Sequence, residues 1–199
     1  MPNQTITGPE VNSFLFRGQH SKAPSTTTGT TAALDPAGKR VVVLGAGGAA
    51  RAITVELALA GVAELTVVNR SEERGRRLCD DLKQRTGVHT DFLPWKAPHR
   101  VGPNVDILVN ATSIGLYPDT EAMPAVDLEG ARDDLLVCDV VPNPPDTRLI
   151  RTARARDLKT LTGLPMLVYQ GAIGFKMWTG HDAPEAAMKA ALEQAFRPE

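Results

Sequence analysis

The stretch of this 199-residue chain that decides the fold is Val41-Val42-Val43-Leu44-Gly45-Ala46-Gly47-Gly48-Ala49-Ala50-Arg51-Ala52. Its first four residues are apolar and three of them are β-branched, which is typical of a buried strand. A glycine-rich turn follows directly, and an alanine-rich segment with helical character comes next. Strand, tight turn and helix in this order form the arrangement that holds the pyrophosphate of a dinucleotide.

The small residues of this turn have separate roles. Gly45 permits the tight turn, Gly47 lets the backbone approach the phosphates, and Ala50 fills the position where helix and strand pack closely. The free N–H groups and positive dipole end of the helix then face the pyrophosphate. Small residues also occur wherever a strand turns sharply into a helix, so the flanking strand and helix give the motif its weight. The predicted phosphate-binding residues are Gly45, Ala46, Gly47, Gly48 and Ala49.

The rest of the chain alternates between apolar runs and segments with helical spacing. We expect strands at 40–44, 64–69, 89–93, 105–110, 135–141 and 159–161. We expect helices at 48–60, 71–85, 147–156, 165–178 and 184–196, with Ser71 as the N-cap of the second. This alternation predicts an α/β fold, a doubly wound parallel sheet of about six strands with C-terminal helices. The expected organisation is an irregular N-terminal segment (1–38), a dinucleotide-binding domain (39–164) and the C-terminal helices (165–199).

Composition narrows the classes of function. The chain is 42% hydrophobic and long enough to bury a core, and its net charge of −1 argues against a general nucleic-acid or membrane-binding surface. No apolar run is long enough to span a bilayer, and the polar N-terminus does not resemble a signal peptide. Cys79 and Cys138 form no metal or redox motif, so we expect buried free thiols, no metal site and a cytoplasmic location.

The end of the second predicted strand indicates which dinucleotide binds. An NAD site usually carries Asp or Glu there, but this chain has Asn69-Arg70-Ser71, with Arg74 three residues on. Arg70 and Arg74 can converge on one anion, and Ser71 can donate to the same phosphate. The pattern favours NADP over NAD. The alternative is that these are ordinary surface arginines at the start of a helix.

Three further stretches carry a resemblance to a known family. They are Asn110-Ala111-Thr112-Ser113-Ile114-Gly115-Leu116, residues 142–149, and Gly163-Leu164-Pro165-Met166-Leu167-Val168-Tyr169-Gln170-Gly171-Ala172. Together with residues 45–52 and 69–71, they make residues 39–196 resemble the shikimate dehydrogenase family, which includes the quinate/shikimate dehydrogenases. The resemblance implies a Rossmann-like NADP-binding domain and the reduction of 3-dehydroshikimate to shikimate with NADPH, a step of aromatic amino-acid biosynthesis.

The resemblance also implies individual roles. Thr112 and Ser113 match the loop beside the adenosine and nicotinamide ribose, and Gly163 and Met166 match positions near the nicotinamide. Gln170 matches a glutamine that reaches the substrate hydroxyls. Without the motif, Met166 would be interpreted as helix packing and Gln170 as a surface amide. The clamp around the adenosine 2′-phosphate is matched by Asn69, Arg70, Ser71 and Arg74.

The sequence departs from the family in three places. The family has a substrate domain before the dinucleotide domain, which supplies a serine pair, the catalytic lysine and its partner aspartate, whereas only residues 1–38 precede the match here. Residues 20–24 faintly resemble the family's substrate loop, but Ala23 replaces one serine and Lys22 has the wrong context for the catalytic lysine. Val141 stands where the family often has a tyrosine. We therefore expect the substrate domain to be largely absent from this chain, and the catalytic residues are unknown.

The last predicted helix carries an apolar stripe at helical spacing, formed by Ala187, Met188, Ala191, Leu192, Ala195 and Phe196. This stripe needs a partner, either the N-terminal segment or a second copy of the chain. We expect a homodimer or a larger assembly through the C-terminal helices.

Three functional hypotheses remain open. The leading one is the NADP(H)-binding domain of a shikimate dehydrogenase-type oxidoreductase, which acts on the small molecules shikimate and 3-dehydroshikimate if a substrate domain is supplied. The second is a non-catalytic NADP-binding or regulatory module. The third is a glutamyl-tRNA reductase-like enzyme, against which the segment through Gln170 argues.

Overall fold

The computed structural model describes residues 35–196. Its strands are β1 (Arg40–Leu44), β2 (Glu64–Asn69), β3 (His89–Pro94), β4 (His99–Arg100), β5 (Ile107–Asn110), β6 (Val126–Asp127), β7 (Leu136–Asp139) and β8 (Lys159–Leu161). Its helices are α1 (Gly48–Leu59), α2 (Glu72–Thr86), α3 (Arg148–Arg154), α4 (Gly163–Thr179) and α5 (Glu185–Ala195). Most of the predicted N-terminal segment, including residues 20–24 with Lys22, lies outside the described residues.

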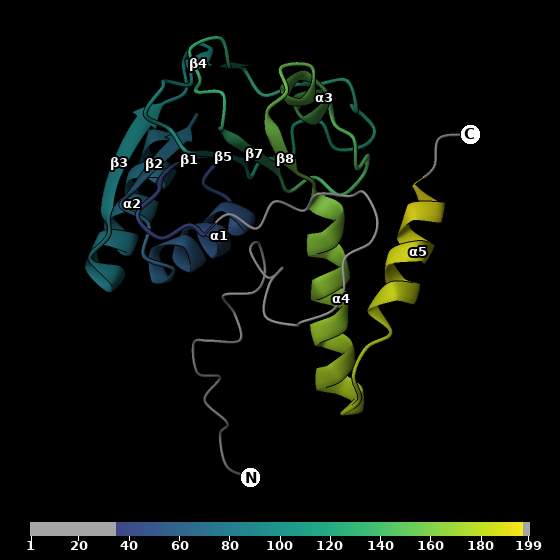
Figure 1. The fold of residues 1–199 in the computed structure, drawn as a ribbon. Coiled ribbons are helices and arrows are strands. Elements are labelled where there is room, and N and C mark those ends of the chain that lie inside the picture. The colour runs from purple at the N-terminus through teal and green to yellow at the C-terminus, as the bar shows by residue number, and fades with distance from the viewer. Residues whose placement is uncertain (1–34, 197–199) are drawn as a thin grey trace.

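Six strands form one parallel sheet in the order β3-β2-β1-β5-β7-β8 (Figure 1). The chain runs outward from β1 to β3 and then returns to the other side of β1, where β5 pairs with it. This reversal is the defining feature of a doubly wound sheet, so the predicted Rossmann-like α/β fold is confirmed.

The apolar run of β1 is explained by burial on both faces of the sheet. Val41 and Val43 belong to the core under α1 and α2, whereas Val42 and Leu44 belong to the core under α3. All four side chains are at most 4% exposed. In the sequence, a central parallel strand that is covered on both faces appears as a continuous apolar run, and residues 41–44 therefore indicate the fold.

The structure differs from the expected elements in several details. A small second sheet, in which β4 pairs with β6, was not predicted because two-residue strands carry no periodicity. The predicted strands 105–110 and 135–141 are shorter, as β5 and β7 show, and α4 begins at Gly163 rather than at residue 165. No helix connects β3 to β5, so the connection does not cover the sheet as a crossover helix would.

Helix α4 begins in very close contact with the end of β7. A Cβ atom at Gly163 would lie 2.6 Å from the carbonyl oxygens of both Val140 and Val141. Real Cβ atoms do not approach backbone atoms this closely, so only glycine fits here. The contact fixes the first turn of α4 against the carboxyl end of the sheet.

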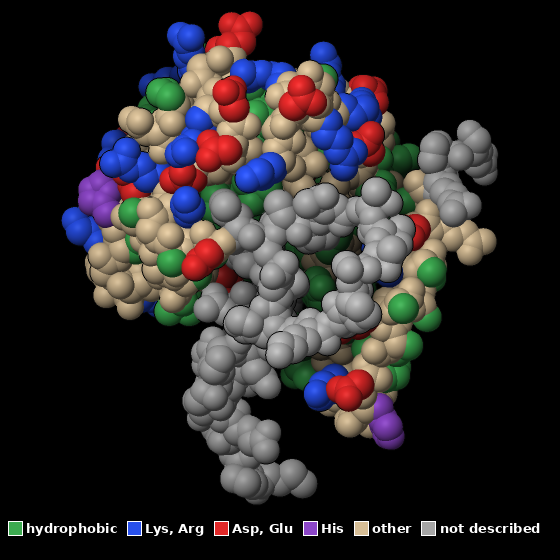
Figure 2. All heavy atoms as spheres, in the orientation of Figure 1, with side chains coloured by type: hydrophobic (Ala, Val, Ile, Leu, Met, Phe, Trp, Pro, Cys, Tyr) green, Lys and Arg blue, Asp and Glu red, His purple; other side chains and the backbone are tan. Residues whose placement is uncertain are grey.

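Beyond its first turns, α4 projects away from the sheet and packs with α5 (Figure 1). Helix α5 has no buried residue, and hydrophobic side chains lie exposed along it (Figure 2). On α4, Ile173, Met177 and Trp178 are 40%, 71% and 87% exposed. Within residues 35–196, no helix is both long and apolar enough to cross a membrane.

The close contact at Gly163 predicts a large difference between two substitutions in the same helix. Gly163→Ala should destabilise the chain by about 1–3 kcal/mol because the new methyl group overlaps backbone oxygens that cannot move aside freely. Gly171→Ala is the matched control, since its Cβ would meet only the Met188 sulfur at 3.8 Å. It should be neutral or stabilise by up to about 1 kcal/mol through helix propensity. Urea unfolding measures both, and equal stability of the two variants would contradict the contact.

Candidate functional site

The predicted site residues gather at the carboxyl edge of the sheet. Strands β1, β2, β5 and β7 are parallel, so their last residues, Leu44, Asn69, Asn110 and Asp139, lie along this edge. The order of the strands reverses between β1 and β5. In open α/β sheets, ligands bind outside the carboxyl ends of the strands at such a reversal.

The turn after β1 requires glycine at position 45 for two reasons. Gly45 has a φ of +105°, a backbone conformation that residues with a side chain rarely adopt. A Cβ here would also lie 3.0 Å from the Ala111 carbonyl oxygen and from the Thr112 methyl carbon. The Gly45 N–H donates to the Val68 carbonyl at 2.8 Å. The turn is therefore held between the end of β2 and the loop that follows β5.

Helix α1 begins at this turn without a capping side chain. Its N-cap is Gly47, no side chain accepts from its first N–H groups, and its first turn contains no acidic residue. Gly47, Gly48 and Ala49 are exposed, whereas Ala46 and Ala50 are buried against the strand. Open space surrounds positions 47 and 48. An uncapped helix start that opens onto free space is suited to bind an anion through backbone N–H groups and the helix dipole.

The residues after β2 form an ordered helix start with two exposed arginines. The Asn69 side-chain amide donates to the Ser71 carbonyl at 2.8 Å, and the Ser71 hydroxyl accepts from the Arg74 N–H at 3.4 Å. Ser71 is thus the N-cap of α2, as the sequence predicted. Arg70 and Arg74 are exposed, and neither forms an ion pair with any other described residue. This arrangement leaves both guanidinium groups available for an external anion.

Two acidic residues lie close to these arginines in the sequence. Glu72 and Glu73 occupy the first turn of α2, where their negative charges interact favourably with the helix dipole. Glu72 is engaged by Arg76, whose guanidinium lies 2.8 Å from the carboxylate and also stands over the Phe92 ring. This pairing partly neutralises Glu72.

A buried carboxylate organises the other half of the edge. Asp139 is 2% exposed and accepts from the Asn110 side-chain amide at 3.0 Å, the Val141 N–H at 3.0 Å and the Thr147 hydroxyl at 2.7 Å. Burial raises the pKa of Asp139, and the three hydrogen bonds oppose that rise. Each of these three partners donates a hydrogen bond, so the Asp139 carboxylate acts only as an acceptor.

Asn110 extends this network into the loop beside Gly45. Its side-chain oxygen accepts from the Thr112 hydroxyl at 2.7 Å and the Thr112 N–H at 3.2 Å. The Thr112 hydroxyl in turn accepts from the Ile114 N–H at 3.1 Å. The hydroxyl of Thr112 is therefore occupied within the loop, whereas Ser113 is exposed and faces outward. Sequence reasoning missed the roles of Asn110, Asp139 and Thr147, although a polar residue that ends a buried apolar strand was the available signal.

The two candidate residues on α4 have different environments. Met166 is half-buried and packs against the core that lies under α1, as helix packing would have predicted. Gln170 follows one turn later and is exposed. Gly163 is buried against the end of β7. The structure thus brings residues 45–49, 112–113 and 163–166 to one edge of the sheet, with 69–74 at the end of the neighbouring strand and Gln170 further along α4.

Known families match most of the chain. Residues 30–154 match the family described as Shikimate / quinate 5-dehydrogenase, and residues 163–193 match the Shikimate 5'-dehydrogenase C-terminal domain. A shikimate dehydrogenase (NADP(+)) from Methanopyrus kandleri is 40% identical over 165 residues, which are 82% of this chain and 57% of that protein. The chain therefore spans little more than half the length of the curated relatives it matches.

Solved structures agree with this relationship. The ligand-free 5-ketofructose reductase of Gluconobacter sp. strain CHM43 is 45% identical, with a TM-score of 0.76 over 82% of this chain and 58% of that protein. A shikimate dehydrogenase in complex with NADP+ is 36% identical, with a TM-score of 0.72 over 81% of this chain and 56% of that protein. By its fold and its sequence, the chain belongs to the shikimate dehydrogenase family.

Proposed function

We propose that the chain binds NADP(H) and serves the reduction of a polyhydroxylated ketone, with 3-dehydroshikimate as the preferred candidate substrate. One observation carries the proposal. Among residues 35–196, α1 begins without a capping side chain at the reversal of strand order, and two exposed arginines without an ion pair to a described residue stand at the end of the adjacent strand. Relatives named as NADP-dependent shikimate dehydrogenases support the choice of cofactor and substrate.

The proposed binding mode divides the cofactor among three segments. The backbone of residues 45–49 holds the pyrophosphate, and Arg70 and Arg74 hold the 2′-phosphate, with Asn69 and Ser71 ordering their backbone. Residues 112–113 border the ribose, and Gly163 and Met166 border the nicotinamide. The cofactor supplies the hydride. Gln170 is proposed to reach the substrate hydroxyls.

The proton of such a reduction needs a donor, and we assign none within the described residues. Two lysine–aspartate pairs occur there, Lys39 with Asp106 and Lys176 with Asp182. The first lies before β1 and β5, at the amino edge of the sheet, and the second lies near the end of α4. Neither is at the carboxyl edge. This placement keeps a non-catalytic NADP-binding module as the alternative for the chain by itself.

A second candidate substrate is 5-ketofructose, because the reductase named for it is 45% identical to this chain. Val141, which stands where the family often has tyrosine, is buried beside Gly163 and offers no side-chain hydroxyl to a substrate. Both candidates are ketones that carry several hydroxyl groups. The two buried cysteines are free, which supports a reducing compartment such as the cytoplasm.

The arginine pair predicts which dinucleotide binds and how binding is lost. Arg74→Ala and Arg70→Ala should each weaken NADPH binding about tenfold, since a charged hydrogen bond to phosphate is worth about 1.5–3 kcal/mol. NADH binding should stay unchanged because NADH lacks the 2′-phosphate. Arg77→Ala, an exposed arginine on the same helix, is the matched control. Fluorescence titration measures each affinity, and equal losses for NADPH and NADH would contradict the assignment.

Turnover assays distinguish an active reductase from a non-catalytic NADP-binding module. An NADP-binding domain that completes the reaction should oxidise shikimate with NADP+ or reduce 5-ketofructose with NADPH, at rates that Gln170→Ala lowers without changing NADPH affinity. A module should bind NADPH and turn over neither substrate. Steady-state absorbance at the nicotinamide band distinguishes these outcomes, and failure to bind NADPH would refute both.

We further propose that the exposed apolar face of α4 and α5 pairs with a second copy of the chain. The face holds Met177 and Trp178, and charges of both signs border it, as in the Lys176–Asp182 and Lys189–Glu193 pairs. In a two-fold interface the same patch of both copies meets itself, so rim charges of both signs can pair across it.

Light scattering tests the interface. The wild-type chain should have a dimer mass, and Trp178→Glu should shift it to a monomer because a charge would be buried in the contact. Leu59→Glu, a substitution of a 61%-exposed leucine on α1, is the control and should keep the dimer. A wild-type monomer at all concentrations would refute the proposal.

A further inference from the structure

The amino-terminal half of β2 and β3 has one bare face. On the covered face, Leu65 and Val67 are fully buried under α1 and α2. On the other face the side chains are polar and half-buried or exposed, because no helix connects β3 to β5 to cover them. Three of these polar side chains are Glu64, His89 and Asp91.

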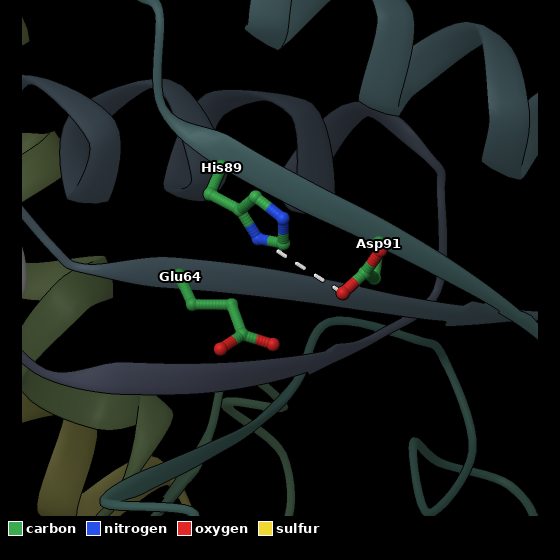
Figure 3. Close-up of side chains that lie close together, drawn as sticks. All are labelled: Glu64, His89 and Asp91. Carbon is green, nitrogen blue, oxygen red and sulfur yellow. Dashed lines mark ion pairs between the residues drawn. The ribbon is translucent and has the colours of Figure 1, made fainter.

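The register of the two strands brings these three side chains together. Glu64 on β2 is the direct neighbour of His89 on β3, and Asp91 is two residues further along β3. Residues two apart in a strand share one face, so all three project to the same side of the sheet (Figure 3). Their potential ligand atoms all lie within 4.8 Å of one another, and the His89 Nδ1 is 3.9 Å from an Asp91 carboxylate oxygen.

We propose that Glu64, His89 and Asp91 form a binding site for a divalent transition-metal ion, with Zn²⁺ as the preferred ion. One imidazole and two carboxylates are a borderline ligand set that suits Zn²⁺ better than Mg²⁺ or Ca²⁺, which prefer oxygen ligands alone. Two ligands on tetrahedral Zn²⁺ lie about 3.3 Å apart for bonds of about 2.0 Å. Rotation of the exposed His89 and Asp91 side chains closes the remaining gap.

The neighbouring residues shape the site. The Arg40 guanidinium lies 3.6 Å from a Glu64 carboxylate oxygen and competes with a cation for that ligand. Its side chain is 54% exposed, so it can turn away into solvent. A hollow of about 160 Å³, lined also by Arg40, Thr66 and Asn104, adjoins Glu64. His89 and Asp91 are exposed, so water can reach the remaining metal positions from solvent. Three protein ligands and open positions describe a non-structural zinc site.

This site is separate from the proposed cofactor site. Glu64 is the first residue of β2 and Asn69 is the last, so the two sites lie at opposite edges of the sheet. Five residue steps along the strand separate Glu64 from Asn69 by about 16 Å. Metal binding and NADPH binding should therefore be independent, and the metal proposal does not rest on the proposed function.

Metal titration of the full chain tests the site. After treatment with a chelator and its removal, calorimetry with Zn²⁺ should show one equivalent bound, and Co²⁺ should give a visible absorption band. His89→Ala should weaken Zn²⁺ binding at least about tenfold and abolish the Co²⁺ band, and Asp91→Asn should weaken binding in the same direction. His181→Ala removes an exposed histidine near the end of α4 and is the matched control, with wild-type binding expected.

The substitution Arg40→Gln tests the metal site independently of its ligands. Because it frees Glu64 from its ion pair, this substitution should tighten Zn²⁺ binding severalfold. The proposal is overturned if wild type binds no Zn²⁺, or if His89→Ala and His181→Ala bind it as wild type does. Unchanged NADPH binding in His89→Ala would verify that the variant is folded, since the substituted side chain is exposed.

Discussion

The carboxylate of Asp139 holds together the segments on which one side of the candidate site depends. It is buried, yet it accepts hydrogen bonds from β5 through Asn110, from the chain after β7 through Val141, and from the start of α3 through Thr147. Thr147 in turn caps α3 by accepting from the Ile150 N–H. Removing the carboxylate would leave three buried donors unpaired, at about 1–3 kcal/mol for each. The network thus makes the loop beside Gly45 and the position of α3 depend on each other.

Two close backbone contacts complete this arrangement. Gly45 lets the turn after β1 lie against the loop after β5, and Gly163 lets α4 start against the end of β7. At Gly163 the contact is with backbone atoms alone, and at Gly45 it is with the Ala111 carbonyl and the Thr112 methyl group. At the start of α1 this edge therefore exposes backbone N–H groups that no side chain caps. Such a surface suits a polyanion, whose oxygens need several donors in fixed positions.

The sequence predicted the parts of the fold whose signals are local. An apolar run marks β1, a glycine turn marks the start of α1, and Ser71 marks the start of α2. All three lie where they were expected. The β4–β6 sheet was missed because pairing of two-residue strands depends on tertiary contacts. The Asp139 network and the Glu64–His89–Asp91 cluster were also missed, because 29 residues separate Asn110 from Asp139 and only strand register brings the cluster together. Exposure of Gln170 and partial burial of Met166 equally depend on how α4 leaves the sheet.

Cofactor binding and proton transfer place different demands on a chain like this one. The first is met by backbone geometry at one edge of a sheet, which requires glycine at a few positions and tolerates many substitutions elsewhere. The second requires a titratable side chain at the reacting atom, and the lysine–aspartate pairs of the described residues lie elsewhere. The two functions can therefore be carried by separate pieces of polypeptide. Helix α4 starts against the candidate site at Gly163, and its exposed apolar side chains, Met177 and Trp178, lie at its far end. A second piece or a second copy that contacts this face would have to reach back along α4 to act on the same ligand.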